Sequence, residues 1–262
     1  MSGFVDLYTA GDTFLHRMDP RVKMLAVLLF SLLAFVLSEL IHLVALLAFI
    51  FLLLVLVRAS VSRTMFALKF VLRFMALIMV MWPLFDPSGT PVLAELGPVK
   101  VTVPGIVHGL TAAARVGCLA TVWYILIFTT AQRDLVRALV KMGVRFDIGL
   151  TLAISLRFFP AFSFLIDSVM DAQRARGMDF AKGNILTRSK NYVAVLAPAV
   201  VTALRMTDTI SLALQSRAYG ARADRTYLRD LRMRWSDYVA ASVVMIIFAV
   251  PVFARFVLDI GV

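Results

Sequence analysis

The 262-residue sequence is poor in cysteine, in histidine and in charged residues. Cys118 is its single cysteine, so the chain can form no internal disulfide and no thiolate metal cluster. Its three histidines are scattered, and it contains neither a His-Glu-x-x-His zinc motif nor a glycine-rich phosphate loop ending in Lys-Ser/Thr. We therefore expect no metal site and no bound cofactor, and these absences argue against the corresponding classes of enzyme.

Charged residues make up only 16% of the sequence, whereas hydrophobic residues make up 61%. A soluble domain has about a quarter of its residues charged, so this composition predicts an all-α polytopic membrane protein. The net charge of +11 comes from 27 lysines and arginines against 16 acidic residues. In a membrane protein such an excess indicates basic cytoplasmic segments, and we expect no nucleic-acid partner.

Apolar segments long enough to cross a bilayer lie on both sides of a more highly charged stretch. A spanning helix needs about 20 predominantly apolar residues. The prediction is about five transmembrane helices, at Met24–Leu40, Ile41–Val57, Phe70–Phe85, Ile106–Ala131 and Tyr238–Leu258. A loop rich in proline and glycine separates the third from the fourth.

The stretch 133–237 is apolar but carries 17 of the 27 basic residues. Hydropathy alone would allow Ile148–Ile166, and also Tyr192–Leu214, to cross the membrane. Both crossings would place the basic segment 167–191 outside, although lysine and arginine favour the cytoplasmic side. The domain prediction therefore has three parts: a cytoplasmic N-terminus with four transmembrane helices in 1–132, one cytoplasmic block in 133–237, and the last transmembrane helix in 238–262.

Two long helices and one short helix are expected in the cytoplasmic block, at Gly149–Arg176, Val193–Arg217 and Arg133–Met142. Each long helix has an apolar face. A face of that length cannot remain in water, so it needs a partner. The two faces include Leu152, Leu156, Phe159 and Phe162 in one helix and Leu204 and Ile210 in the other.

Both long helices end in an arginine that is followed closely by glycine. The first ends in Ala175-Arg176-Gly177, and the second in Ser216-Arg217-Ala218 with Gly220 two residues later. One interpretation is ordinary capping, since arginine favours a helix C-terminus and glycine adopts the left-handed conformation beyond it. Repetition on two adjacent helices that need partners favours a second interpretation, a pair of docking ends. A third basic motif, His16–Lys23, precedes the first transmembrane helix and is also typical of a juxtamembrane anchor.

Together the three motifs resemble those of the transmembrane coupling subunit, or T component, of energy-coupling factor (ECF) transporters, the CbiQ/EcfT type. The resemblance covers nearly the whole chain. His16–Lys23 is similar to the family's opening, and Leu156–Pro160 to the region ahead of its first signature. Ala175-Arg176-Gly177 matches the first Ala-Arg-Gly signature, whereas Ser216-Arg217-Ala218 stands where the second belongs and differs from it at both flanks.

The resemblance implies a non-catalytic subunit of an ABC-type importer of vitamins or transition-metal ions, located in a bacterial or archaeal cell (inner) membrane. It implies that the signatures around Arg176 and Arg217 dock into two ATPase subunits. The apolar faces are then expected to contact the S component, the membrane protein that binds the substrate. Motion of the ATPases would pass through the coupling helices and reorient the S component.

Two other functions are open alternatives. A membrane enzyme of the phosphoalcohol transferase kind could use Asp171 and Asp179, but no further acidic cluster follows to hold its metal. A secondary transporter or conventional permease needs ionisable residues at mid-membrane, for which Arg73 and Arg115 are the candidates. Arg73 is expected near the cytoplasmic end of its helix. For Arg115, the alternative to a substrate path is a helix that begins later than Ile106.

Overall fold

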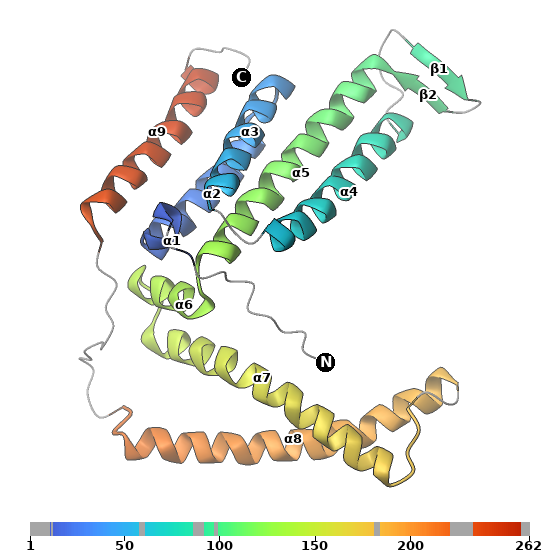
Figure 1. Cartoon of the computed structure of the whole chain (residues 1–262), viewed down its shortest axis with the longest axis vertical. Coiled ribbons are helices and arrows are strands. Elements are labelled where there is room, and N and C mark those ends of the chain that lie inside the picture. The colour runs from blue at the N-terminus through green and yellow to red at the C-terminus, as the bar shows by residue number, and fades with distance from the viewer. Residues whose placement is uncertain are drawn as a thin grey trace. The chain divides into compact units, whose positions relative to one another are not determined.

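The structure of the chain is a computed structural model, and it describes residues 11, 13–57, 61–85, 92–96, 99–180, 184–220 and 233–257. That part of the chain contains nine helices and one two-stranded sheet (Figure 1). The chain divides into two compact units, the first formed by Met1–Gly143 and Leu231–Val262 and the second by Val144–Asp230.

Helix α5 is the central element of the first unit. It packs against α2, α3 and α4, while α2 also packs against α6 and α9 (Figure 1). The helices of this unit are α1 (Phe14–Arg17), α2 (Pro20–Val36), α3 (Leu40–Leu56), α4 (Val61–Phe85), α5 (Val103–Thr129), α6 (Gln132–Lys141) and α9 (Trp235–Val257). The core lies where α2, α3 and α5 meet, and its largest buried side chains include Phe30, Leu33, Leu43, Ile50 and Phe128.

Small residues along one face of α5 allow α4 to approach closely. They recur every four residues, and all are buried: Gly105, Gly109, Ala113 and Gly117. A Cβ atom on Gly109 would lie 3.2 Å from Pro83 Cδ and from Trp82 Cβ, both on α4. One on Gly117 would lie 2.8 Å from the Met75 sulfur. This stripe is a helix-packing motif typical of membrane proteins.

A short antiparallel hairpin precedes α5, formed by β1 (Val92–Leu96) and β2 (Val99–Thr102). The sequence predicts only a loop here, and most of the prolines and glycines on which that prediction depends lie outside the described residues. The Thr102 hydroxyl accepts a hydrogen bond from Gly105 N at 3.2 Å. This cap starts α5 at Val103, three residues before the predicted Ile106.

The second unit is a pair of long helices, α7 (Phe146–Ala175) and α8 (Ile185–Ser216), which pack against each other (Figure 1). Near the end of α7, Gln173 Nε2 donates to the Ala194 carbonyl in the first third of α8 at 3.4 Å. Just past the end of α8, the Tyr219 hydroxyl donates to Asp147 Oδ1 at the start of α7, at 2.8 Å. The two helices therefore run antiparallel.

The predicted helices exist, but several begin at other residues. α4 begins at Val61 rather than Phe70, and α8 begins at Ile185 rather than Val193. In both cases the helix continues through a polar stretch, because polar residues near a membrane surface do not end a helix unless a cap or a proline stops it. The predicted end of the last helix, Leu258, lies outside the described residues.

Five helices in the described part of the chain are long and apolar enough to cross a membrane, which confirms the helical membrane fold class. They are Leu68–Phe85, Val103–Thr129, Phe146–Ala175, Arg188–Ser216 and Trp235–Arg255. The number agrees with the prediction, but the membership differs. α7 and α8 qualify by length and composition, whereas α2 and α3 have 17 residues each and fall short of that length. The side of the membrane on which 133–237 lies stays a prediction.

Candidate functional site

Helix α7 ends in a Schellman motif at the first arginine signature. Gly177 N donates to the Arg174 carbonyl at 2.9 Å, and Met178 N donates to the Gln173 carbonyl at 3.1 Å. Gly177 has a φ of 87°, the left-handed conformation that this motif requires. Arg176 is the C-cap residue, and its side chain is exposed at the tip of the helix.

Helix α8 ends in the same motif at the second signature. Ala218 N donates to the Gln215 carbonyl at 2.9 Å, and Tyr219 N donates to the Leu214 carbonyl at 3.0 Å. Ala218 has a φ of 56° and is the one non-glycine residue with positive φ in the described part of the chain. Arg217 is therefore the C-cap residue of α8, and it is also exposed.

The two signatures are equivalent position by position. Arg176 corresponds to Arg217, and Gly177 corresponds to Ala218 in the left-handed position. Glycine adopts that conformation without strain, whereas an L-residue with a Cβ atom pays roughly 1–2 kcal/mol there. These bonds confirm the capping interpretation at Gly177, whereas the left-handed residue that caps the second helix is Ala218 and not the predicted glycine, Gly220. The docking interpretation of Ala175-Arg176-Gly177 and Ser216-Arg217-Ala218 stays a prediction.

The two arginine ends lie at opposite ends of the α7–α8 pair. This follows from the antiparallel packing, and it is secured by the hydrogen bond from Tyr219 to Asp147. α7 has 30 residues, which corresponds to about 45 Å of straight helix. Arg176 and Arg217 are therefore separated by roughly the length of a helix, too far for one narrow groove to receive both.

The other charges near the end of α7 are paired with each other. Arg174 contacts Asp171 at 2.9 Å, and its guanidinium lies 5.8 Å from the centre of the Phe180 ring. Asp171, a candidate for the phosphoalcohol transferase alternative, is thus engaged by an arginine. Among the described residues, no group of three or more histidine, cysteine or acidic side chains is placed to hold a metal ion.

The apolar positions predicted to meet a partner are largely uncovered. Leu152 and Leu156 are each 39% exposed, Phe159 is 50% exposed and Leu204 is 61% exposed, whereas Phe162 and Ile210 are partly buried. Other exposed apolar positions on these helices lie off the predicted stripes, and two of the most exposed belong to this group. They are Phe164, which is 74% exposed, and Leu212, which is 66% exposed.

The motif before the first transmembrane helix forms a buried polar cluster. Asp19 caps α2 by accepting a hydrogen bond from Arg21 N at 2.9 Å. Its own N–H donates to Asp237 Oδ1 of α9 at 3.1 Å, and Asp237 Oδ2 accepts from Arg234 N at 2.8 Å. Both carboxylates are almost fully buried. The starts of α2 and α9 are therefore joined by hydrogen bonds.

Lys23 belongs to the same cluster and lies just before the predicted start of the membrane span at Met24. Its Nζ donates to the His16 carbonyl at 3.2 Å and to the Thr129 carbonyl at the end of α5 at 3.0 Å. Burial lowers the pKa of Lys23 to about 8, and the nearby carboxylates, Asp134 foremost, oppose that shift. The predicted juxtamembrane anchor is thus in large part an internal cross-link between helices.

Arg115 has a structural partner inside the chain. Its Nε donates to the Ala34 carbonyl at 2.9 Å, and its terminal NH2 donates to the Leu37 carbonyl at 3.0 Å. These carbonyls belong to the C-terminal turn of α2, which has no helical partners for them and favours a cation. The alternative that its helix begins later than Ile106 is wrong, because α5 begins at Val103. A substrate path is not needed to explain this arginine.

The family model described as CbiQ, cobalt transport protein, matches residues 11–228. The chain is 32% identical to the energy-coupling factor transporter transmembrane protein EcfT of Brevibacillus brevis, over 93% of this chain and 94% of that protein. It is 31% identical to the proteins of the same name from Streptococcus equi, over 92% of both chains, and from Thermosediminibacter oceani, over 95% of this chain and 97% of that one.

The matches cover both structural units, so they include the capped helix ends as well as the membrane helices. They favour the coupling function over the enzyme and permease alternatives. With its multi-pass helical architecture, this chain belongs to the CbiQ family and is the transmembrane component of an energy-coupling factor transporter, a non-catalytic subunit.

Proposed function

We propose that this chain couples two ABC-type ATPase subunits to a substrate-binding S component, for the uptake of a vitamin or a transition-metal ion. The observation that carries the proposal is the pair of equivalent helix ends, each with an exposed arginine at the C-cap. Because Arg176 and Arg217 lie at opposite ends of an antiparallel pair, each end would serve one ATPase subunit.

The chemistry of these ends suits docking into a protein groove. The Schellman bonds already satisfy carbonyls of the last turn, so a helix tip can be buried in a partner without leaving these acceptors unpaired. Arginine offers five N–H donors in a planar fork and binds a carboxylate through two parallel hydrogen bonds. Arg176 and Arg217 would therefore bind acidic or carbonyl groups of the ATPase grooves.

The docking ends must face the cytoplasm, where ATP is available. We infer that 133–237 and the N-terminus are cytoplasmic in a bacterial or archaeal cell (inner) membrane. The support is the distribution of charge: 17 of the 27 basic residues fall in 133–237, whereas Lys100 is the one basic residue between the predicted spans on the outer side. The S component would rest on the uncovered apolar positions of α7 and α8.

Purification of the tagged chain from its own host in mild detergent tests both contacts. Replacing Arg176→Glu together with Arg217→Glu reverses the charge at both helix ends. We expect at least about a tenfold loss of co-purified ATPase subunits, since like charges would face each other in a desolvated groove. The matched control is Arg157→Glu with Arg205→Glu, which changes exposed arginines in the middle of the same helices and should retain the ATPases.

A second arm separates the S component from the ATPases. Leu204→Glu places a charge on the apolar face of α8 and should release the S component while the ATPases remain bound. Thr209→Glu, an exposed polar position on the same helix, is its control. Retention of ATPases and of transport activity by the double arginine variant would show that the docking assignment is wrong.

A further inference from the structure

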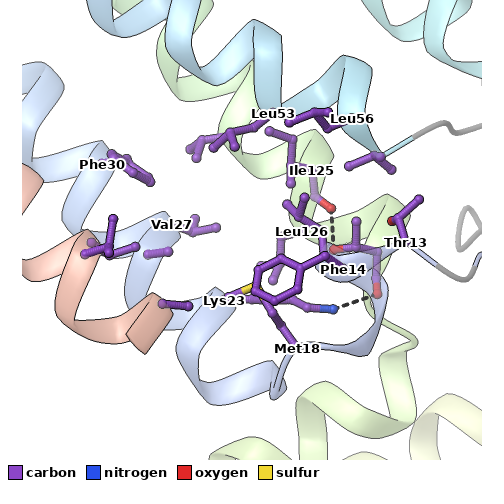
Figure 2. Close-up of a pocket in the computed structure, with 18 of the residues that line it drawn as sticks. Thr13, Phe14, Met18, Lys23, Val27, Phe30, Leu53, Leu56, Ile125 and Leu126 are labelled. Atoms are coloured by element: carbon purple, nitrogen blue, oxygen red, sulfur yellow. Dashed lines mark hydrogen bonds between the residues drawn. The ribbon is translucent and has the colours of Figure 1, made fainter. Parts of the chain in front are cut away.

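A large apolar cavity lies in the first unit and is lined by residues of α1, α2, α3, α5 and α9. Its volume is about 1040 Å³. Figure 2 shows aliphatic and aromatic side chains around it, among them Val27, Phe30, Leu53, Ile125 and Leu126. Protein interiors are close-packed and contain few voids larger than a water molecule. This space is much larger than such voids and is open to the surface, so molecules around the protein can enter it.

The cavity opens between α3 and α9 and beside α1, where Phe14 lines it and is 59% exposed. Leu56 of α3 lines it and is 52% exposed, and Val239 and Val243 of α9 line it and are each 48% exposed. α3 packs against α5 and α9 packs against α2, so α2 and α5 form the floor of the opening. Both rim helices are apolar along their length. The opening therefore faces the hydrocarbon of the bilayer.

The depth of the cavity matches one leaflet. Its lining residues on α9 extend from Ser236 to Ile247, about 17 Å of helix, and those on α3 extend from Phe49 to Val57, about 12 Å. The hydrocarbon core of a bilayer is about 30 Å thick. A partner's spanning helix would need a groove along the whole thickness, and a helix end inside this one would leave backbone groups unsatisfied. A lipid of one leaflet has the right length.

One end of the cavity is polar. It is lined by Lys23 near the start of α2, Ser236 at the start of α9 and Thr13, which precedes α1. Figure 2 shows the Lys23 ammonium near Phe14 and Met18, with its hydrogen bond to the Thr129 carbonyl. Lys23 is only 6% exposed. A buried ammonium at the end of an apolar cavity complements an anionic headgroup at the end of acyl chains.

Basic residues outnumber acidic ones near this end in the sequence. The three carboxylates near this end already accept hydrogen bonds. Asp19 accepts one from the backbone N–H of Arg21, and Asp237 accepts from the backbone N–H groups of residues 19 and 234. Asp134 accepts one from the guanidinium of Arg137. The basic side chains near these groups in the sequence are more numerous: Arg17, Arg21, Lys23, Arg133, Arg137 and Arg234. Basic segments at the membrane surface attract anionic lipids.

We propose that the cavity binds an anionic phospholipid from the leaflet on the side of this basic segment. The acyl chains lie between α3 and α9, and the phosphate lies at Arg17–Lys23. The site is independent of the docking ends on α7 and α8, so it holds or fails separately from the proposed coupling function.

Native mass spectrometry of the purified, delipidated chain tests the site, with palmitoyl-oleoyl phosphatidylglycerol as the probe. We expect one tightly held lipid per chain. Val243→Trp fills the mouth of the cavity and should weaken this binding at least about tenfold. Val250→Trp is the matched control, because Val250 is exposed on the same helix but does not line the cavity, and it should bind as the unmodified chain does.

Two further measurements test the headgroup. Phosphatidylcholine, which has the same acyl chains and no net charge, should bind more weakly than phosphatidylglycerol. Arg17→Gln should weaken phosphatidylglycerol binding by about fivefold, the contribution of one basic residue at an anionic surface. Equal binding by the two tryptophan variants, or equal binding of the two lipids, would overturn the proposal. A protein partner in the cavity would also overturn it. Such a partner would co-purify with the Val250→Trp chain but not with the Val243→Trp chain, while both chains bound lipid equally.

Discussion

At the scale of single residues, Gly177 and Ala218 decide how the two arginine-bearing helix ends are built. Both occupy the left-handed position of a Schellman motif, at φ values of 87° and 56°. A Cβ atom on Gly177 would meet nothing within 4 Å, so steric contact does not explain the glycine there. The two sites share a backbone conformation and differ in the residue that adopts it, glycine or alanine, which makes them a matched pair.

We predict that Ala218→Gly stabilises the end of α8 and that Gly177→Ala destabilises the end of α7, each by about 1 kcal/mol. The measurement is protection of the amides of the last turns against hydrogen exchange in detergent-purified protein. Protection should rise at Tyr219 in the first variant and fall at Met178 in the second. A fall in both variants would contradict the shared geometry.

At the scale of helices, the small-residue stripe of α5 sets the position of α4. Hydropathy predicts α5 as an apolar span but does not predict this stripe. The signal was present, because Gly105, Gly109, Ala113 and Gly117 recur every four residues. A hydropathy average hides it, since glycine and alanine are neither strongly apolar nor polar. A local sequence pattern does not show which helix packs against such a stripe.

We predict that Gly109→Leu destabilises the first unit by about 1–3 kcal/mol, because the new side chain would enter the space of Pro83 and Trp82. The measurement is the thermal unfolding midpoint of the purified chain in detergent. Val107→Leu is the control, since Val107 is 43% exposed on the same helix and should leave the midpoint unchanged. Equal midpoints for the two variants would show that α4 does not depend on the stripe.

Helix ends were the least predictable feature at this scale. α4 and α8 both extend beyond their predicted starts, into segments that contain Lys69 in one case and Arg188 and Lys190 in the other. Charge and hydropathy report how deep a residue lies in a membrane. The end of a helix depends instead on where the backbone bonds stop, and a helix can continue from the bilayer into water.

At the scale of the whole molecule, the chain consists of a membrane unit and a pair of long, poorly buried helices. Length and composition allow α7 and α8 to cross a membrane, whereas the distribution of basic residues predicts that they lie in the cytoplasm. The two criteria disagree because the apolar faces of α7 and α8 serve a protein partner in our proposal, and such a face has the same hydropathy as one that meets lipid.

We predict that a cysteine placed at Asn184→Cys, in a Cys118→Ser background, is not labelled by a membrane-impermeant maleimide added to intact cells. It should be labelled once the cells are permeabilised, because residue 184 lies between α7 and α8 and is exposed. Cys118 is the single native cysteine and is buried, so the background is simple to prepare. Labelling in intact cells would place the connection outside and overturn the cytoplasmic assignment.

The sequence by itself determined the membrane class, the family and the two arginine signatures. Each depends on composition or on residues adjacent in the chain, whose physical effects are local. The tertiary structure alone decided that α7 and α8 run antiparallel, that Arg115 binds the end of α2, and that Asp19 is joined to Asp237 across 218 residues of sequence. Such contacts arise when packed helices bring distant polar groups out of water together, and no local pattern states which groups will meet.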